Sequence, residues 1–261
     1  MRFSLWLSRR FHYVCIMDWA GQCAAVIPCF NEAPHIHRVV RQVRRHLPRV
    51  FVVDDGSSDG TSRVAAGAGA EVIRHAFNLG KGMALRTGWR HAFEHGFKWA
   101  LTLDGDGQHS PDDGPNFFAR AERGASKLVV GNRMDRPGTM PPLRRRVNRW
   151  MTRRLSNLTG ACLADSQCGF RLVHLETLAR LSLTTRRFEI ESELLTAFLG
   201  AGHLVDFVPI KVIYDGGASR IRPLADSYRW ACWWFAERKK NFSVPPSFVG
   251  GGLRKHPQKS F

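Results

Sequence analysis

The stretch that decides the expected fold is Trp99–Asp113, WALTLDGDGQHSPDD. Its apolar first half predicts a buried strand, which ends in the acidic turn DGDGQ at residues 104–108. Glycines in such a turn allow backbone geometry, and a close approach of a ligand, that larger residues prevent. Two carboxylates one residue apart suit Mg²⁺ or Mn²⁺, with substrate phosphates completing the coordination shell. A turn that only caps a helix starting near Ser110 would explain the same residues, so the wider pattern has to decide.

Apolar runs alternate with amphipathic helices on both sides of this stretch. We expect strands at 23–28, 50–53, 71–74, 99–103 and 127–130, separated by helices at about 33–47, 61–69, 81–94 and 112–123. The run Val50–Val53 is continuously apolar, as expected for a parallel strand that is covered on both faces. This alternation predicts an α/β fold with a mostly parallel central sheet flanked by helices. Ligands of such a sheet lie outside the carboxyl ends of its strands.

The character of the chain changes after Pro142, where a basic amphipathic helix is predicted. One helical face of residues 143–158 carries apolar side chains, and arginines crowd the remaining surface. The apolar set is Leu143, Val147, Trp150, Met151, Leu155 and Leu158. A basic helix with a tryptophan is typical of a membrane interface, but a core-facing helix with a solvated exterior explains it equally well. The sequence leaves both interpretations open.

The last part of the chain is predicted to hold short elements and a second basic helix. A short helix follows Arg171, and another helix runs from about 188 to 202. Residues 204–214 form a long strand in which Pro209 favours a sheet edge or a bulge. A helix at about 225–241 mixes tryptophans with arginine and lysine, which again suits a membrane interface. We expect an N-terminal extension at 1–22, a main domain at 23–222, this basic aromatic helix within 223–242, and a disordered tail at 243–261.

Composition narrows the class of protein. The chain has 261 residues, and 39 Lys and Arg against 22 Asp and Glu give a formal charge of +17, so the surface should attract nucleic acid, anionic membranes or phosphate-bearing substrates. The six cysteines form no C-x-x-C pair, which favours reduced thiols in the cytosol. No apolar run approaches the roughly 20 residues of a membrane-spanning helix. Scattered histidines without H-E-x-x-H predict no zinc site, and neither a dinucleotide fingerprint nor a phosphate-binding loop is present.

Polar clusters follow the predicted strands, and each carries groups that could bind part of a nucleotide or its phosphates. Asp55 and Glu32 could accept hydrogen bonds from ribose hydroxyls or a base edge, and the 104–108 turn could hold a divalent ion that neutralises a leaving nucleoside diphosphate. Arg133 and Arg220 could add positive charge against phosphates. Singly, each could be a cap or a surface charge. Their positions at successive strand ends of one sheet make a shared function the better interpretation.

Five ordered motifs carry a resemblance to a known family. They are Ile27–Glu32 (IPCFNE), Val53–Asp59 (VDDGSSD), Asn78–Gly82 (NLGKG), Leu103–His109 (LDGDGQH) and Asp165–Arg171 (DSQCGFR). Together they resemble family 2 glycosyltransferases, and within these the dolichol-phosphate mannosyltransferase or polyprenyl-phosphate glycosyltransferase group. The resemblance covers about 23–222 and implies a GT-A, nucleotide-diphospho-sugar-binding α/β domain in an enzyme that is usually inverting. It is less specific for the acceptor than for the family.

The resemblance also implies roles for individual residues. The nucleotide-sugar site would be formed by Pro28, Phe30, Glu32, Val53, Asp55, Asp104, Gly105, Asp106, Arg133 and Arg220. The metal ligands would be Asp104, Asp106 and Gln108, binding Mg²⁺ or Mn²⁺, and the residues expected to act on the reacting groups are Asp106, Arg133 and Arg220. Relatives often have lysine where this chain has Arg220, which keeps the charge. The expected partners are a nucleotide-sugar donor, a polyprenyl-phosphate acceptor and an anionic membrane surface, with the protein peripheral at the cytoplasmic face.

The acceptor decides the expected mechanism. A lipid phosphate monoester is largely dianionic near neutral pH, so its oxygen could attack the anomeric carbon without a protein base. A saccharide hydroxyl would need a general base, for which Glu191 and Glu189 are candidates, although acidic residues also favour a helix N-terminus. A basic nucleic-acid-binding protein is a remote alternative that leaves the acidic clusters unexplained. A nucleotidyltransferase would need a basic glycine-rich loop after the first strand, where this chain has C-F-N-E.

Overall fold

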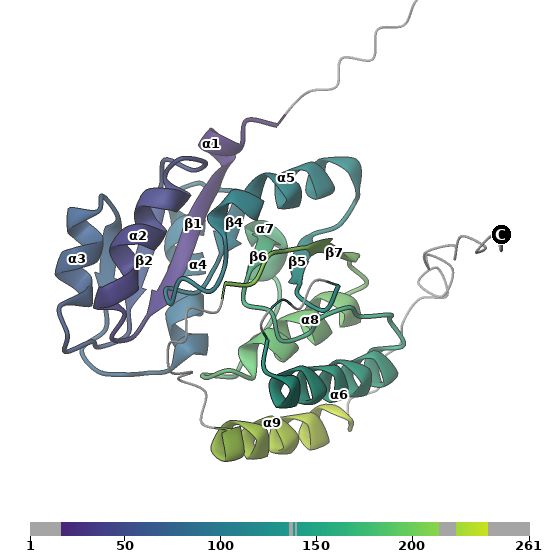
Figure 1. Cartoon of the computed structure of the whole chain (residues 1–261). Coiled ribbons are helices and arrows are strands. Elements are labelled where there is room, and N and C mark those ends of the chain that lie inside the picture. Colours follow the sequence, from purple (N-terminus) through teal and green to yellow (C-terminus); the bar gives the residue numbers. More distant parts are fainter. Residues whose placement is uncertain (1–16, 136–137, 139, 214–222, 240–261) are drawn as a thin grey trace, which may run out of the picture.

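A computed structural model describes residues 17–135, 138, 140–213 and 223–239. These residues form a seven-stranded sheet with helices on both faces (Figure 1). The strands are β1 (Cys23–Cys29), β2 (Val50–Asp54), β3 (Glu71–Arg74), β4 (Trp99–Thr102), β5 (Leu128–Asn132), β6 (Arg171–His174) and β7 (Val205–Pro209). Their order is β3-β2-β1-β4-β6-β5-β7, and every pairing is parallel except those of β6 with β4 and β5. The predicted α/β fold with a mostly parallel sheet is confirmed.

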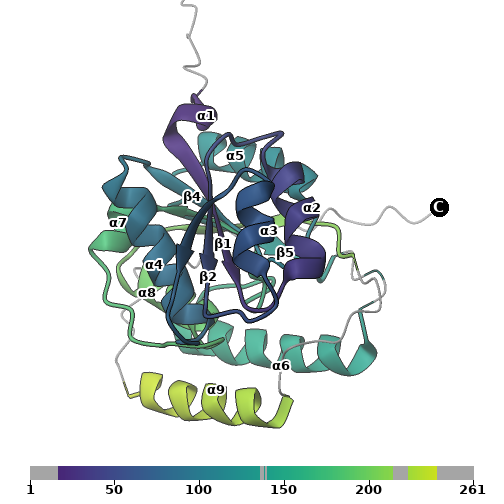
Figure 2. The ribbon, with the colours of Figure 1, turned by 90° about the vertical axis from the view of Figure 1, so that its left-hand side faces the viewer.

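Two layers of helices cover the sheet, one on each face (Figure 2). One layer contains α2 (Ala33–Val43), α3 (Thr61–Gly67) and α5 (Gly114–Arg123), and the other contains α4 (Lys81–Glu94), α7 (Leu175–Ala179) and α8 (Ile190–Gly200). The short helix α1 (Trp19–Gln22) precedes β1, and a 3₁₀ turn (Pro111–Asp113) precedes α5. The amphipathic stripe of α2 is fully buried, as its spacing predicts. The residues between these layers form one hydrophobic core.

The sequence predicted every strand except β6. Its apolar segment is very short, because only Leu172 and Val173 separate Arg171 from His174. Both are completely buried, since β6 lies between β4 and β5 in the interior of the sheet. The short helix expected after Arg171 is α7, which follows β6 directly. The edge position expected from Pro209 is confirmed, because β7 is an edge strand and Pro209 is its last residue.

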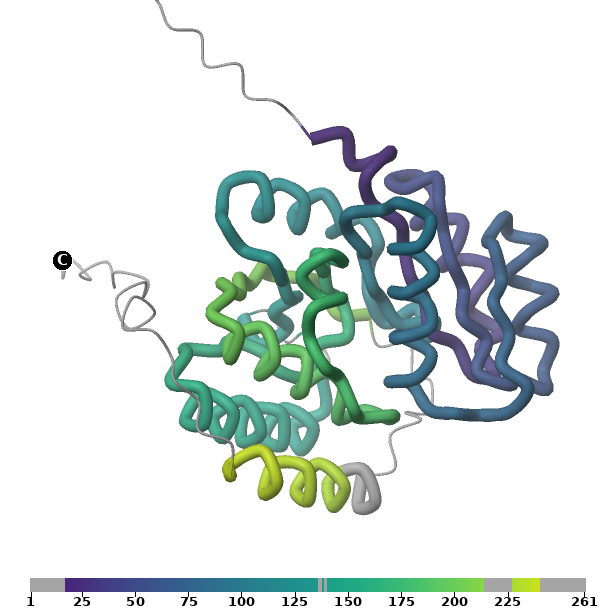
Figure 3. The backbone as a smooth tube through the Cα atoms, turned by 180° about the vertical axis from the view of Figure 1, so that it is seen from behind, coloured from purple at the N-terminus to yellow at the C-terminus, as the bar shows by residue number. Residues whose placement is uncertain are grey.

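Helices α6 (Pro142–Thr159) and α9 (Pro223–Glu237) lie side by side at one end of the sheet (Figure 3). The trace of β1 runs from α1 toward this pair, so α6 and α9 lie at the carboxyl ends of the parallel strands (Figure 1). The Trp150 and Trp230 rings, with centroids 5.5 Å apart, join the two helices. The Trp230 indole also donates a 2.9 Å hydrogen bond to Ser192 Oγ of α8, which attaches α9 to the main domain.

Only part of the predicted apolar face of α6 is turned to the core. Its core-facing side is half polar and consists of Asn148, Met151, Thr152, Leu155 and Thr159. The first part of the predicted stripe points to solvent instead, with Leu143 73%, Val147 37% and Trp150 49% exposed. At 100° per residue the predicted stripe is one arc of about 140°. The fold buries the edge of that arc that carries Met151 and Leu155 and leaves the other edge in solvent.

Several expectations fall on residues outside the described ranges. These are residues 1–16 of the predicted extension, the loop that contains Arg220, and the tail at 243–261. Within the described part of the chain, none of the helices has both the length and the apolar composition needed to cross a bilayer.

Candidate active site

All five sequence motifs meet at the carboxyl edge of the sheet: strand directions bring four of them there, and Lys81 of the fifth contacts Asp104. Strands β1, β2 and β4 are mutually parallel, so the residues that follow Cys29, Asp54 and Thr102 emerge at the same edge. Strand β6 runs the opposite way, with Arg171 paired to Thr102, so the motif that precedes it reaches this edge too. The chain leaves β1 toward β2 on one side and toward β4 on the other, and ligands of open α/β sheets bind at such a switch point.

A lysine between two carboxylates occupies the centre of this edge. Lys81, the first residue of α4, places its ammonium nitrogen 2.6 Å from Asp104 Oδ1 and 2.6 Å from Glu191 Oε1. Burial alone would lower the pKa of Lys81, but the charges of Asp104 and Glu191 outweigh it and raise that pKa above its ordinary value. Burial would likewise raise the pKa of Asp104, yet Lys81, followed by His109, holds it well below its usual range. Lys81 and Asp104 are therefore both charged near neutral pH.

Gly169 lets the Asp165–Arg171 motif approach this charged cluster. A Cβ atom on Gly169 would lie 2.7 Å from Asp104 Oδ2 and 3.0 Å from Lys81 Nζ, so no side chain fits there without displacing the pair. Arg171 holds the motif in place, because its buried guanidinium donates to the carbonyl oxygens of Ser166, Cys168 and Glu191. Burial lowers the pKa of Arg171. The close approach explains the glycine within the motif.

The predicted metal ligands form a compact, partly exposed turn after β4. Asp106 accepts a 3.0 Å hydrogen bond from the backbone N–H of Gln108, and this is its only hydrogen bond within the described residues. The backbone carbonyl of Gln108 is held by the N–H of Ile213 at 3.0 Å. Gly105 is buried, and a Cβ there would lie 2.5 Å from Cys29 Sγ. These carboxylate and amide oxygens are donors that fit Mg²⁺ or Mn²⁺.

The residues expected to line the nucleoside lie on β1 and β2 and just beyond them. Pro28 and Val53 are buried neighbours in the parallel ladder, whereas Phe30, the residue after β1, exposes 38% of its surface. Glu32 is buried at the start of α2, where its N–H donates to Thr61 Oγ1 at 2.8 Å. The exposed ring of Phe30 is thus the apolar surface of this group that a ligand can reach.

Asp55 has a structural task that its sequence context did not indicate. Its buried carboxylate accepts hydrogen bonds from His75 Nδ1 at 2.7 Å, Leu79 N at 2.9 Å and Gly80 N at 2.7 Å. These bonds fix the loop between β3 and α4, which carries Lys81 at its end. Asp55 therefore positions Lys81 through the backbone, and contact of Asp55 with a nucleoside stays a prediction.

Arg133 also has a partner within the protein. Its guanidinium forms a bidentate pair with Asp165, with Nε to Oδ2 at 2.7 Å and Nη2 to Oδ1 at 2.9 Å, and both side chains are buried. Burial would lower the pKa of Arg133 and raise that of Asp165, but the facing opposite charges reverse both shifts. The pair connects β5 to the Asp165–Arg171 motif. Contact of Arg133 with a phosphate stays a prediction, and Arg220 lies outside the described residues.

Of the two candidate bases, only Glu191 lies in the charged cluster. Glu189 instead faces Arg229 of α9, with a 3.4 Å separation between Oε1 and Nε. Lys81 and His109 were not among the predicted site residues, yet they contact Asp104 directly, His109 with Nε2 3.7 Å from Oδ2. The sequence could have indicated both residues, because each lies inside one of the five motifs. Lys81 lies between two glycines, and His109 directly follows the acidic turn.

Comparison with known proteins agrees with this geometry. The family model described as glycosyl transferase family 2 matches residues 24–180. A UDP-N-acetylglucosamine–dolichyl-phosphate N-acetylglucosaminyltransferase of Methanococcus voltae is 32% identical, covering 72% of this chain and 84% of the relative. An undecaprenyl-phosphate mannosyltransferase of Micrococcus luteus is 30% identical, covering 67% of this chain and 77% of the relative.

Solved structures show the same fold. Glucosyl-3-phosphoglycerate synthase from Mycobacterium tuberculosis, in complex with Mn²⁺, UDP and phosphoglyceric acid, superposes with a TM-score of 0.65 at 22% identity, covering 87% of this chain and 80% of that one. The same enzyme in complex with UDP gives a TM-score of 0.66. The expected GT-A-like fold is confirmed. The chain therefore belongs to glycosyl transferase family 2 and is an enzyme related to polyprenyl-phosphate sugar transferases.

Proposed function

We propose that the protein transfers a sugar from a nucleotide-diphosphate donor to a polyprenyl phosphate at the cytoplasmic face of a membrane, with inversion and with Mg²⁺ or Mn²⁺. One observation carries the proposal: the acidic turn follows β4 at the carboxyl edge of the sheet, where α6 and α9 also lie with exposed aromatic and basic side chains (Figure 1). A donor held at the turn would thus be presented to an acceptor whose lipid tail stays in a bilayer. The names of the two relatives, which include dolichyl-phosphate and undecaprenyl-phosphate, support the acceptor class.

The donor would bind over the ends of β1, β2 and β4. Phe30 offers an exposed ring beside the buried Glu32, a combination that suits a nucleoside. Asp104, Asp106 and Gln108 would hold the metal ion, which would neutralise charge on the departing nucleoside diphosphate. Lys81 keeps the Asp104 carboxylate ionised and in place through its 2.6 Å contact. Arg133 and Arg220 stay our candidates for contacts with phosphate.

The membrane surface would be the outward side of α6 together with exposed parts of α9. Three apolar α6 residues alternate there with Arg146, Arg153 and Arg154, all of which are exposed. Tyr228 and Phe235 of α9, 72% and 59% exposed, add aromatic area. Arg154 lies over the Trp150 ring at 5.5 Å and the Trp234 ring at 5.7 Å, which ties the charge to the aromatic groups. Arginine beside tryptophan is the composition that anionic bilayer interfaces attract.

The reaction needs little acid–base chemistry if the acceptor is a lipid phosphate. The phosphate oxygen is already ionised near neutral pH, so the protein has to position two anionic partners and stabilise the leaving diphosphate. Glu191 favours the alternative acceptor, a saccharide or other small-molecule hydroxyl, because it is a carboxylate in the cluster that could serve as a base. Its Oε1 accepts from Lys81, so it could take a proton there only if that 2.6 Å bond opened.

A donor screen tests the proposal. Purified protein is incubated with radiolabelled nucleotide sugars, polyprenyl phosphate in vesicles and Mn²⁺ or Mg²⁺, and label in the organic phase is counted. We expect label from one donor, lost on addition of a chelator. Donor hydrolysis without lipid labelling would shift the acceptor to a saccharide. No binding of any nucleotide sugar would refute the donor assignment itself.

A further inference from the structure

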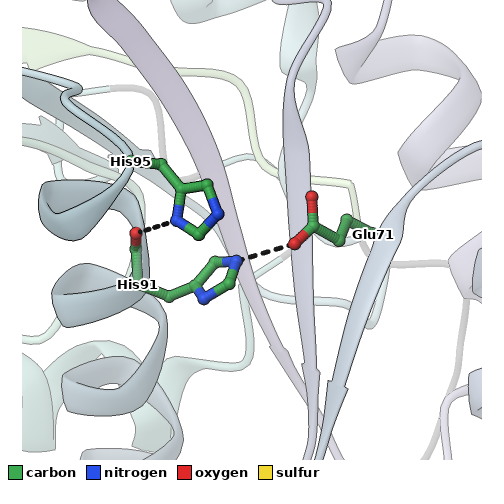
Figure 4. A group of neighbouring side chains, drawn as sticks. All are labelled: Glu71, His91 and His95. Carbon is green, nitrogen blue, oxygen red and sulfur yellow. Dashed lines mark hydrogen bonds and ion pairs between the residues drawn. The ribbon is translucent and has the colours of Figure 1, made fainter.

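A cluster of two histidines and a glutamate lies far from the candidate active site. His91 and His95 are one turn apart at the C-terminal end of α4, and Glu71 is the first residue of the neighbouring strand β3 (Figure 4). One ligand atom from each residue lies within 4.8 Å of the others. Lys81 begins the same helix ten residues before His91, so at 1.5 Å per residue the cluster lies about 15 Å from the lysine. The cluster is therefore separate from the metal site proposed for sugar transfer.

One hydrogen bond orients His95 for a cation, whereas a metal ion would replace the proton that His91 Nε2 donates to Glu71. The carbonyl oxygen of His91 can only accept, so the 2.8 Å contact with His95 Nδ1 makes that nitrogen the donor and leaves the lone pair on Nε2. Histidines that bind metals in proteins commonly donate their other ring nitrogen to a carbonyl in this way. His91 Nε2 lies 2.7 Å from Glu71 Oε1, and Figure 4 shows both rings directed toward the glutamate.

The protein core supports the two rings. Phe51, 1% exposed on β2, contacts the His91 ring edge-on at 4.7 Å and the His95 ring at 5.8 Å. The rings lie 4.0 Å apart at an angle of 40°. Their position on the last turn of α4 adds the negative end of the helix dipole, which favours a cation. The apolar support restricts the rings, while Glu71 and His95 stay exposed, so an ion can enter from solvent.

We propose that Glu71, His91 and His95 bind a divalent transition-metal ion of the Zn²⁺ class, with solvent in the remaining coordination positions. Two imidazole nitrogens and one carboxylate oxygen are a set of protein ligands that Zn²⁺ uses in open sites. The ion would connect the edge strand β3 to α4 and stabilise that edge of the sheet. This proposal differs from the expectation of no zinc site. Sequence spacing could not reveal it, because Glu71 precedes His91 by 20 residues and joins it only through the fold.

Equilibrium dialysis of the full chain against Zn²⁺ tests the proposal. The wild type should bind one equivalent that the double variant His91→Gln/His95→Gln loses, with affinity at least about 10-fold weaker. The matched control His35→Gln/His37→Gln removes two histidines from α2, and Asp106→Asn removes a proposed ligand of the other metal site; both should keep this equivalent. Zinc should raise the melting temperature of the wild type and of both controls, and should not raise that of the double variant.

Cobalt identifies the ligands directly. Co²⁺ bound through nitrogen and oxygen gives visible ligand-field bands without the strong thiolate charge-transfer band that exposed Cys162 or Cys232 would produce. We expect the ligand-field bands in the wild type and their loss in Glu71→Gln and in the double variant. Circular dichroism of the metal-free variants confirms that they are folded. The proposal is overturned if the folded double variant binds as much Zn²⁺ as the wild type, or if the Co²⁺ spectrum is that of a thiolate site.

Discussion

Two charged regions of this protein lie at the same end of the sheet but are built in opposite ways. In the charged cluster of Lys81, Asp104 and Glu191, and in the nearby pair of Arg133 and Asp165, every charge has a fixed partner in a largely buried setting. The outward side of α6 instead has exposed arginines among exposed apolar side chains. Buried charges depend on their partners for stability, whereas exposed charges act at longer range and are screened by salt.

The largest effect is expected from breaking the buried pair. Asp165→Asn keeps the shape of the side chain and leaves the Arg133 guanidinium charged in a buried position, so the free energy of unfolding should fall by about 3–5 kcal/mol. Urea denaturation measures this. The matched control Glu176→Gln removes an exposed partner of Arg180 and should change stability by less than about 0.5 kcal/mol. If both variants lost the same free energy of unfolding, burial would not determine how much these ion pairs contribute to stability.

The second effect is expected from the charged cluster itself. Lys81→Met keeps the length of the side chain but leaves Asp104 and Glu191 facing each other, which should cost about 2–4 kcal/mol at neutral pH. The loss should shrink as the pH falls, because without Lys81 the pKa of Asp104 rises and its carboxylate can take up a proton. Adding Glu191→Gln to the variant should recover part of the stability. A loss unaffected by pH and by the second substitution would contradict the electrostatic explanation.

Substitutions on the exposed side of α6 should weaken membrane binding without changing the stability of the protein. Arg146→Gln/Arg153→Gln removes two charges worth about 1 kcal/mol each near an anionic bilayer, so flotation with anionic vesicles should weaken about 30-fold. The melting temperature should stay within experimental error. Arg41→Gln/Arg63→Gln, with the same loss of charge on α2 and α3, serves as the control. If both variants float equally well or equally poorly, α6 is not the membrane surface.

The smallest effect concerns His174, which is intermediate between the two regions in exposure. Burial, followed by the charge of Lys127, lowers the pKa of His174 to about 4 from an ordinary value of 6.5. Between these values the unfolded chain binds a proton that the native protein does not, so this group makes stability fall as the pH drops from 6.5 to 4.

With partial exposure taken into account, the loss in this window should be about 1–2 kcal/mol. His174→Asn keeps an N-cap for α7 and removes the titration, so its unfolding free energy should depend less steeply on pH. Chemical denaturation at a series of pH values compares the slopes. Identical slopes for the variant and the wild type would exclude His174 as their source.

Some features of the fold and the site could be predicted from the sequence, and others depend on contacts between distant segments. The apolar run of β6, Leu172 and Val173, is as short as that of the predicted strand β3, but it leads directly into α7 without a turn. Its place in the sheet therefore depends on tertiary pairing. Motif positions at strand ends predicted Asp104 and Asp106 at the carboxyl edge. The contact of Lys81 with Asp104 and Glu191 was not predictable in this way, because it joins three elements far apart in the chain.

For the basic helices, the sequence predicted the kind of surface but not which residues form it. Their composition predicted an aromatic and basic surface, and much of α6 is such a surface, but composition could not say which apolar residues face the core. That division depends on where α8 packs against α6, which buries Leu155 and leaves Trp150 half exposed. A helical pattern predicts the direction of each side chain relative to its neighbours, and the fold decides which direction is the inside.

The most direct test of the central claim compares two aspartates near the end of β4 in the lipid-labelling assay. Asp106→Asn removes a charge from the acidic turn at the carboxyl edge, whereas Asp112→Asn removes one from a 58% exposed side chain whose partner is His46. We predict that Asp106→Asn lowers metal-dependent transfer at least about 100-fold, since it removes a ligand that stabilises the leaving diphosphate, and that Asp112→Asn transfers like the wild type. Transfer by Asp106→Asn at the wild-type rate would contradict the assignment of the active site to this turn.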